Sequence, residues 1–210
     1  MAHFDAKQIS FIAIMSAFGI LLSGISLNVA PILNTVSGGA IAGAALDLSH
    51  IATFIAAIFG GPYVGAMVGF LSGIYSGYYF GYVMGSLGLL SLIGIPFGKA
   101  LTGLIAGFLY KKLRVNNNSR PSISTVLVIL VSYVPECVFT ILYFLYIVLY
   151  VYGYAMEFML PIVIPKAWIE ILLMSFLMGA LVGNIGFRDF VFKFLHPSML
   201  ERPGRASKNK

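Results

Sequence analysis

Apolar runs, each ended by glycine, proline or charge, fill most of this sequence and leave few possibilities for its fold. Hydrophobic residues make up 60% of the 210 residues and charged residues only 10%, against about 25% charged in soluble domains. A helix of about 20 apolar residues crosses a bilayer, and the chain has room for about six such helices. The sequence therefore predicts an all-α polytopic membrane protein with six transmembrane helices.

The predicted spans are residues 8–27, 46–59, 63–80, 87–110, 123–152 and 164–185. The second is short for a full span, so the preceding NTVSGGAIAGAA is expected to add helical or re-entrant backbone. GGPYVG predicts a tight turn between the second and third spans, because Pro62 cannot continue a helix. Residues 1–187 are assigned to the membrane domain and residues 188–210 to a basic tail, whose end, HPSMLERPGRASKNK, is expected to be disordered.

The distribution of lysine and arginine predicts the orientation, because cytoplasmic loops carry an excess of both. With six spans all the basic groups fall on one side, which makes both termini cytoplasmic and the protein a multi-pass protein of the cell membrane. Topology thus accounts for the net charge of +6, with anionic lipid as a weaker partner and no nucleic acid. The basic residues are Lys7, then Lys111, Lys112, Arg114 and Arg120, and finally Arg188, Lys193, Arg202, Arg205, Lys208 and Lys210.

Ionisable side chains occur within the predicted spans, where each is costly and so a hypothesis of function. Counted along the helices at about 1.5 Å per residue, all of them fall in the outer half of the membrane or near its midplane. Asp47 and His50 are expected in the first turns of a helix that descends from outside. This asymmetry predicts a polar pocket that opens outward and is closed by apolar packing below. The residues are Asp47, His50, Lys99, Glu136 and Glu170.

Structural roles for the same residues remain open. Lys99 and Glu136 could form an ion pair that holds helices together. Asp47 could cap its own helix and interact favourably with the helix dipole. His50 could be a hydrogen-bonded packing residue. Asp47 and His50 are too few to predict a zinc or cobalt site, and the single cysteine, Cys137, allows no disulfide within the chain.

Aromatic residues are dense toward the predicted outer ends of the helices. Glu136, Thr140 and Tyr143 fall on one helical stripe, which makes Tyr143 the strongest aromatic candidate for ligand contact. Tyr75, Tyr79 and Trp168 are further candidates. The alternative is an aromatic belt at the membrane interface, where tyrosine and tryptophan are enriched.

Three segments in order resemble the substrate-binding S components of energy-coupling factor (ECF) transporters. AIMSA in the first span matches the family's small residues spaced by four, at Ala13 and Ala17. FIAAIFGGPYVGAMVGFLSG is similar to its second helix, turn and glycine-rich third helix, and GIPFGKALTGLIAGFLYKKLR to its fourth helix with a basic end. Small-residue pairs at Gly103 and Gly107, and at Gly179 and Gly183, predict close helix packing.

The resemblance implies capture of a vitamin or similar micronutrient from outside, and docking of Ala13 and Ala17 on a transmembrane coupling subunit. It also implies that two cytoplasmic ATPases supply the energy. No GxxxxGK[ST] motif occurs in this chain, so ATP is expected on partner subunits, with no cofactor and no enzyme activity here. The main alternative is a stand-alone secondary transporter or channel, which would need a polar path through both halves of the membrane. An intramembrane enzyme and a purely structural membrane protein are weaker alternatives.

Overall fold

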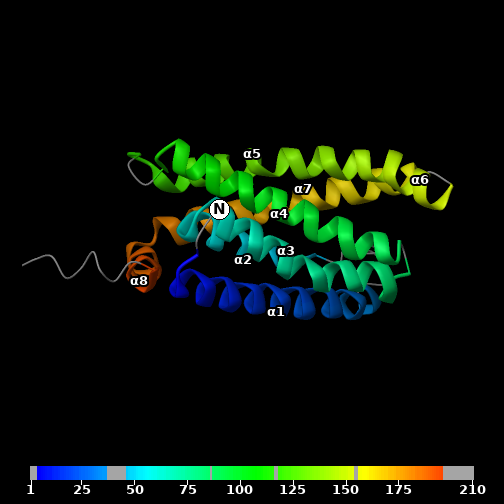
Figure 1. Ribbon diagram of the computed structural model, residues 1–210, viewed down its shortest axis with the longest axis horizontal. Coiled ribbons are helices and arrows are strands. Elements are labelled where there is room, and N and C mark those ends of the chain that lie inside the picture. The colour runs from blue at the N-terminus through cyan, green and yellow to red at the C-terminus, as the bar shows by residue number, and fades with distance from the viewer. Residues whose placement is uncertain (1–3, 37–45, 86, 116–117, 154–155, 196–210) are drawn as a thin grey trace, which may run out of the picture.

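The computed structural model describes residues 4–36, 46–85, 87–115, 118–153 and 156–195. These residues form an elongated bundle of helices, and no strand occurs among them, so the predicted all-α class is confirmed (Figure 1). The elements are α1 (Ala6–Val36), α2 (His50–Ile55), η1 (Ala56–Gly60), α3 (Pro62–Tyr78), η2 (Tyr79–Val83), α4 (Leu89–Lys112), α5 (Pro121–Leu142), η4 (Tyr143–Ile147), α6 (Val148–Tyr152), η5 (Glu157–Met159), α7 (Leu160–Gly183) and α8 (Ile185–Leu195).

Four helical stretches in the described part of the chain are long and apolar enough to cross a membrane, and they coincide with the first, fourth, fifth and sixth predicted spans. They are Ala6–Val29, Leu89–Lys112, Pro121–Tyr152 and Glu157–Gly183. The second predicted span is a shorter apolar helix, His50–Gly60. The third, made of α3 and η2, is not among the four, because tyrosine, glycine and serine lower its mean hydropathy. The tight turn before it is confirmed: Gly61 has a φ of 92°, and Pro62 begins α3.

α3 lies between α1 and α4, and glycine lets its backbone approach α4 closely (Figure 1). A Cβ atom at Gly69 would lie 2.8 Å from the carbonyl carbon of Lys99, and one at Gly73 would lie 2.6 Å from Cα of Pro96. Such contacts are shorter than side-chain carbon permits, so glycine is required along this α3–α4 seam. The seam glycines are Gly65, Gly69, Gly73 and Gly77 of α3 and Gly81 of η2.

The predicted small-residue pairs also lie at close helix contacts. A Cβ at Gly107 would lie 2.6 Å from Cα of Pro62, and one at Gly179 would lie 2.8 Å from Cγ2 of Val126. Close packing is therefore confirmed for α4 against the start of α3 and for α7 against the start of α5.

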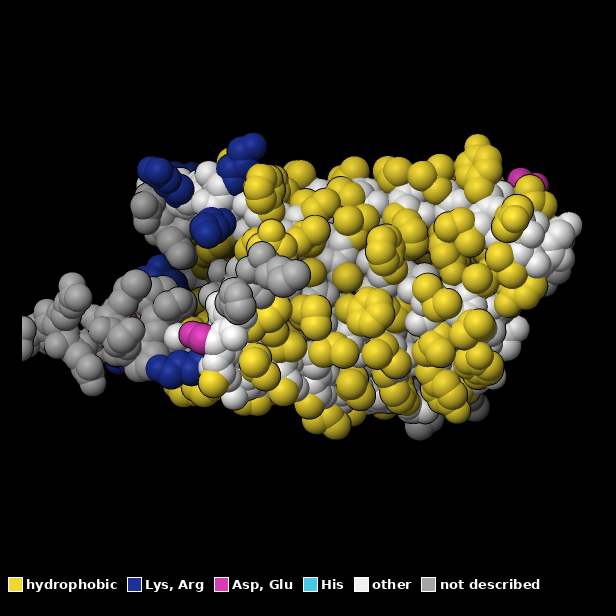
Figure 2. All heavy atoms as spheres, viewed as in Figure 1, with side chains coloured by type: hydrophobic (Ala, Val, Ile, Leu, Met, Phe, Trp, Pro, Cys, Tyr) yellow, Lys and Arg dark blue, Asp and Glu magenta, His cyan; other side chains and the backbone are white. Residues whose placement is uncertain are grey.

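α8 packs back against the bundle. The Phe194 and Phe11 rings lie 6.2 Å apart between centroids, and the Phe187 and Phe59 rings 5.9 Å apart. This helix continues through the predicted boundary after residue 187, and the predicted disordered end, residues 196–210, lies outside the described residues. Lysine and arginine gather at the end of the molecule that carries α8, while hydrophobic side chains cover most of the rest of the visible face (Figure 2).

Candidate functional site

The segment directly before α2 is not helical, although it lies inside the bundle. Asp47 is 5% exposed and Ser49 is fully buried. Its backbone N–H groups donate to side-chain oxygens. The N–H of Asp47 donates to Oε1 of Glu170 (2.9 Å), that of Leu48 to Oγ of Ser26 (3.4 Å) and that of Ser49 to Oδ1 of Asp47 (3.0 Å). Non-helical backbone at membrane depth is tolerated where it is buried in protein or lines a cavity, and here these bonds stabilise it.

The start of α2 corrects the prediction that Asp47 lies in the first turn of a helix. The helix begins at His50, so Asp47 precedes it in a turn instead of lying in its first turn. Its carboxylate accepts the N–H of Ser49 in a local turn, and α2 has neither an acid in its first turn nor a side-chain cap bond, so the predicted role at the helix terminus is wrong. The same carboxylate makes further bonds, to three other helices.

Lys99 binds Asp47 from α4. Its side chain is 2% exposed, and its ammonium group donates to the Asp47 carboxylate, to the Ser49 hydroxyl and to the Ser76 hydroxyl (2.9 Å). These three acceptors match the three donors of an ammonium group. Ser23 of α1 donates to Oδ1 of Asp47 at 2.6 Å, and Ser76 of α3 donates to Oδ2. Asp47 and Lys99 therefore connect the segment before α2 to α1, α3 and α4.

Glu136 forms a second group beside the first. It accepts a hydrogen bond from Thr102 of α4, and its Oε2 lies 3.3 Å from Nε2 of His50. Glu136 and His50 are 8% and 5% exposed. The alternative pairing of Lys99 with Glu136 is thus replaced by Lys99 with Asp47 and Glu136 with His50. The other ring nitrogen of His50, Nδ1, is buried without a hydrogen-bond partner in the described part of the structure.

Glu170 completes the polar cluster from α7. Besides the Asp47 N–H, its Oε1 lies 3.6 Å from Nζ of Lys166, one turn earlier on the same helix. That ammonium group also lies 4.9 Å from the centre of the Phe80 ring. Three carboxyl groups, two lysines and His50 therefore lie together in this part of the structure.

The ionisable residues occupy one level of the bundle. At about 1.5 Å per residue, Lys99 lies about 20 Å from the basic end of α4, Glu136 about 22 Å from that end of α5, and Glu170 about 20 Å from that end of α7. Asp47 lies at a similar distance from the end of η1. The sequence predicted that Asp47 and His50 lie in the first turns of a helix descending from outside. In the structure only a short helix follows them, so both residues lie near the middle of the bundle.

Aromatic candidates surround this level without hydrogen bonds to its charged groups. The Tyr79 hydroxyl donates to the carbonyl of Leu27 (3.0 Å) and the Tyr143 hydroxyl to that of Leu90 (2.6 Å). Tyr75 accepts from the Asn28 amide at 2.8 Å. Trp168 packs edge-on against Tyr133 with ring centres 5.1 Å apart, and Thr140 is half-buried one turn after Glu136.

Four hydroxyl residues and one lysine in the polar cluster were missed by the sequence reasoning. Serine and threonine are common in membrane helices and carry no charge, so they gave no signal alone. Thr102 follows Lys99 by one turn on the same face, and this spacing could have identified it. A second signal was proline: Pro96, Pro135 and Pro165 lie inside α4, α5 and α7, within about two turns of the charged residues. The missed residues are Ser23, Ser49, Ser76, Thr102 and Lys166.

Ala13 and Ala17, the predicted docking residues, are both exposed on α1. They lie among exposed apolar side chains of the same helix, including Ile14 and Leu21. The patch is open to contact with lipid or with a partner helix.

A helical bundle with membrane-length helices and a buried polar cluster defines an integral membrane protein with a candidate binding site for a polar solute. In the described residues, no group of three or more His, Cys, Asp or Glu side chains is arranged to hold a metal ion. Residues 7–182 match the family model described as ECF transporter, substrate-specific component. The chain belongs to this family. Searches among curated proteins and among solved structures found no match.

Proposed function

We propose that this chain captures a vitamin or similar small micronutrient from outside the cell for an ECF-type importer. The observation that carries the proposal is the polar cluster: buried charges at mid-depth are costly, and the family is one of substrate-binding subunits. Asp47, Lys99, Glu136, His50 and Glu170 are the proposed primary contacts. Because they include both charge signs, the substrate would be a zwitterion or a molecule of mixed polarity.

The Asp47–Lys99 group and the Glu136–His50 group of the cluster are suited to different roles. Lys99 donates to three acceptors, and Asp47 accepts a backbone N–H of the segment before α2. Both residues therefore stabilise the fold as well as presenting a charge to a substrate. Glu136 has fewer partners, and His50 has a free Nδ1 among the described residues. We propose that Glu136 and His50 exchange their hydrogen bonds for substrate first, since an unsatisfied buried nitrogen gains most from a new partner.

The aromatic predictions stay part of this proposal. Since the hydroxyls of Tyr79 and Tyr143 already donate to backbone carbonyls, contact with a substrate heterocycle would use their ring faces. Tyr75, Thr140 and Trp168 are proposed as further contacts beside the polar cluster.

For the assembly, we propose six membrane crossings with both termini cytoplasmic. The gathering of lysine and arginine at one end supports this orientation (Figure 2). The exposed face of α1 around Ala13 and Ala17 would dock on a transmembrane coupling subunit, and two cytoplasmic ATPases would hydrolyse ATP. Small residues suit such a contact because they let helices approach closely in lipid.

A stand-alone secondary transporter is the second candidate, since such proteins bind substrate at helices broken near the membrane midplane. In this chain, residues 46–49 are non-helical directly before α2 and lie near the middle of the bundle. Uptake by cells that lack any coupling subunit would favour this candidate, whereas uptake only with the coupling subunit and ATPases supports the importer.

The binding test starts from native mass spectrometry of the purified protein, which identifies any small molecule retained. Binding of that molecule is then measured for Glu136→Gln and His50→Gln, with Glu157→Gln as control because Glu157 is exposed and distant from the cluster. We expect a loss of roughly tenfold or more for the first two, from one lost charged hydrogen bond, and wild-type affinity for the control. Undiminished binding in both cluster variants would rule out the proposed site.

A further inference from the structure

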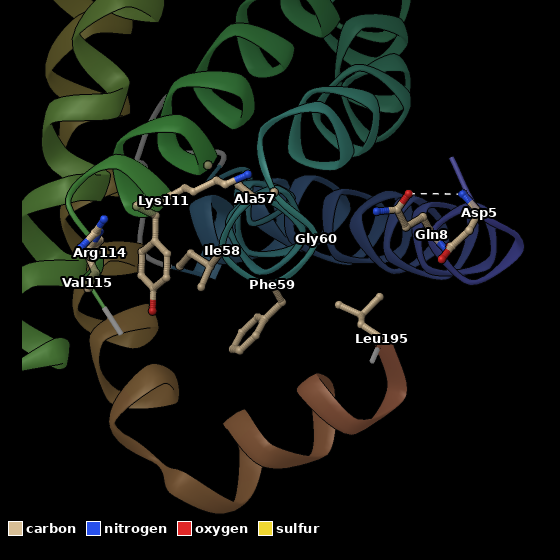
Figure 3. Close-up of a pocket in the computed structure, with 13 residues that line it drawn as sticks. Asp5, Gln8, Ala57, Ile58, Phe59, Gly60, Lys111, Arg114, Val115 and Leu195 are labelled. Atoms are coloured by element: carbon tan, nitrogen blue, oxygen red, sulfur yellow. Dashed lines mark hydrogen bonds between the residues drawn. The ribbon is translucent and has the colours of Figure 1, made fainter. Parts of the chain in front are cut away.

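A cavity lies at the basic end of the molecule, away from the polar cluster. Its volume is about 490 Å³, and it is enclosed by the start of α1, the end of η1, the end of α4 and the end of α8. Figure 3 shows Arg114 and Val115 on one side, Asp5 and Gln8 on the opposite side, and Leu195 of α8 below.

The walls of this cavity differ in polarity. Ile58, Phe59 and Leu195 supply apolar surface, while Lys111 and Arg114 supply two cations. Both cations are exposed, so they keep their charge without burial cost. A ligand that fits would combine a negatively charged group with an apolar portion.

One acid, Asp5, also lines the cavity, on the side opposite Arg114. Asp5 accepts the Gln8 N–H at 2.7 Å, and the Gln8 side chain accepts the Asp5 N–H at 3.3 Å, which is the reciprocal arrangement of a helix capping box. Its charge thus serves the N-terminus of α1. Basic residues exceed acidic ones at this end of the described structure. They are Lys7, Lys111, Lys112, Arg114, Arg120, Arg188 and Lys193, against Asp5 and Asp189.

The backbone holds Arg114 in an unusual conformation. Its φ is 47°, which is uncommon for a residue with a side chain, and its N–H donates to the carbonyl of Lys111 at 3.2 Å. This turn ends α4 with both cations at one cavity. The cavity also lies where α1 begins and α4 ends, which is the level of lipid headgroups if these helices span the membrane.

We propose that this cavity binds the phosphate of an anionic phospholipid in the adjacent leaflet, with Lys111 and Arg114 as its ligands. Basic pockets between membrane helices are suited to phospholipid headgroups, and each nearby basic residue strengthens such binding about fivefold. The acyl chains would lie along the apolar surface of the bundle, next to Phe59 and Leu195. This site is independent of substrate capture.

The test uses short-chain phosphatidylglycerol, titrated into detergent-solubilised protein and counted by native mass spectrometry, with phosphatidylcholine as the neutral comparison. We expect Lys111→Gln with Arg114→Gln to weaken binding of phosphatidylglycerol by roughly 25-fold. The control, Lys112→Gln with Arg120→Gln, removes the same charge from residues outside the cavity wall and should bind like wild type.

Further variants and competitors distinguish a specific site from diffuse charge attraction. Arg114→Gly removes one cation and relieves the positive φ, so it should fold and still lose about fivefold in binding. Equal loss in the cavity variant and the control would mean diffuse attraction and overturn the proposal, as would displacement of the lipid by equimolar inorganic phosphate. If the cavity variant keeps the lipid but loses a co-purifying coupling subunit, the cavity is a protein-docking surface and the proposal is wrong.

Discussion

The α3–α4 seam gives the sharpest prediction, at Gly69. An alanine methyl there would lie 2.8 Å from the carbonyl carbon of Lys99 and closer still to its oxygen, where ordinary contacts begin at 3.4 Å. The helices must therefore separate by at least about 0.6 Å at the residue that binds Asp47. Overpacking of this kind costs about 1–3 kcal/mol.

Gly24 of α1 provides the matched control. An alanine methyl at Gly24 meets its nearest atom, Cζ of Tyr75, at 3.8 Å, which is ordinary contact. Both substitutions gain the same helix propensity, about 0.5–1 kcal/mol, so the difference between Gly69→Ala and Gly24→Ala isolates the packing cost.

The assay is thermal unfolding in one detergent, followed by the fluorescence of Trp168, the only tryptophan. A difference of about 1–3 kcal/mol corresponds to roughly 2 to 12 °C for a chain of this size, with Gly69→Ala the lower. Equal unfolding midpoints for the two variants would refute the close approach of α3 and α4 on which the position of Lys99 depends.

Four further predictions concern docking, the cluster, the aromatics and the topology. Ala13→Trp with Ala17→Trp should abolish co-purification with a coupling subunit, whereas Leu127→Trp with Val131→Trp, a pair that is also exposed but lies on α5, should not; survival of the complex in the first variant would contradict docking there. Glu170→Leu should lower the free energy of unfolding by about 1–3 kcal/mol, because it leaves the buried Asp47 N–H unpaired, and Glu170→Gln should lower it less; equal effects in thermal unfolding would argue against that bond. Tyr143→Phe should cost about 1 kcal/mol of stability through its lost bond to Leu90 and leave substrate affinity unchanged, while Tyr143→Leu should weaken binding; the reverse result would assign the hydroxyl to the substrate. In a Cys137→Ala background, an impermeant maleimide should label Glu157→Cys from outside intact cells and Lys193→Cys only after permeabilisation, and the opposite pattern would invert the proposed orientation.

Most of the architecture was predictable from the sequence because it depends on chain-local properties. Apolar length gave the helices of α1, α4, α5 with α6, and α7, and proline after two glycines gave the turn at Gly61 and Pro62. The short helix after Asp47 was harder, since the same apolar run is compatible with a full or a partial span. Its start depends on bonds from Glu170 and Ser26, which are distant in sequence.

By itself, the sequence determined that this chain is a membrane protein and pointed to five of the ionisable residues of the polar cluster, because charge is costly to bury in lipid whatever its partner; it missed Lys166. Only the tertiary structure decided the pairing of those charges. Lys99 had several carboxylates at similar depth, and the choice of Asp47 depends on which helix faces meet across the glycine seam. The uncharged hydroxyls of Ser23, Ser76 and Thr102 likewise became part of the site only once packing brought them within hydrogen-bond distance of Asp47 and Glu136.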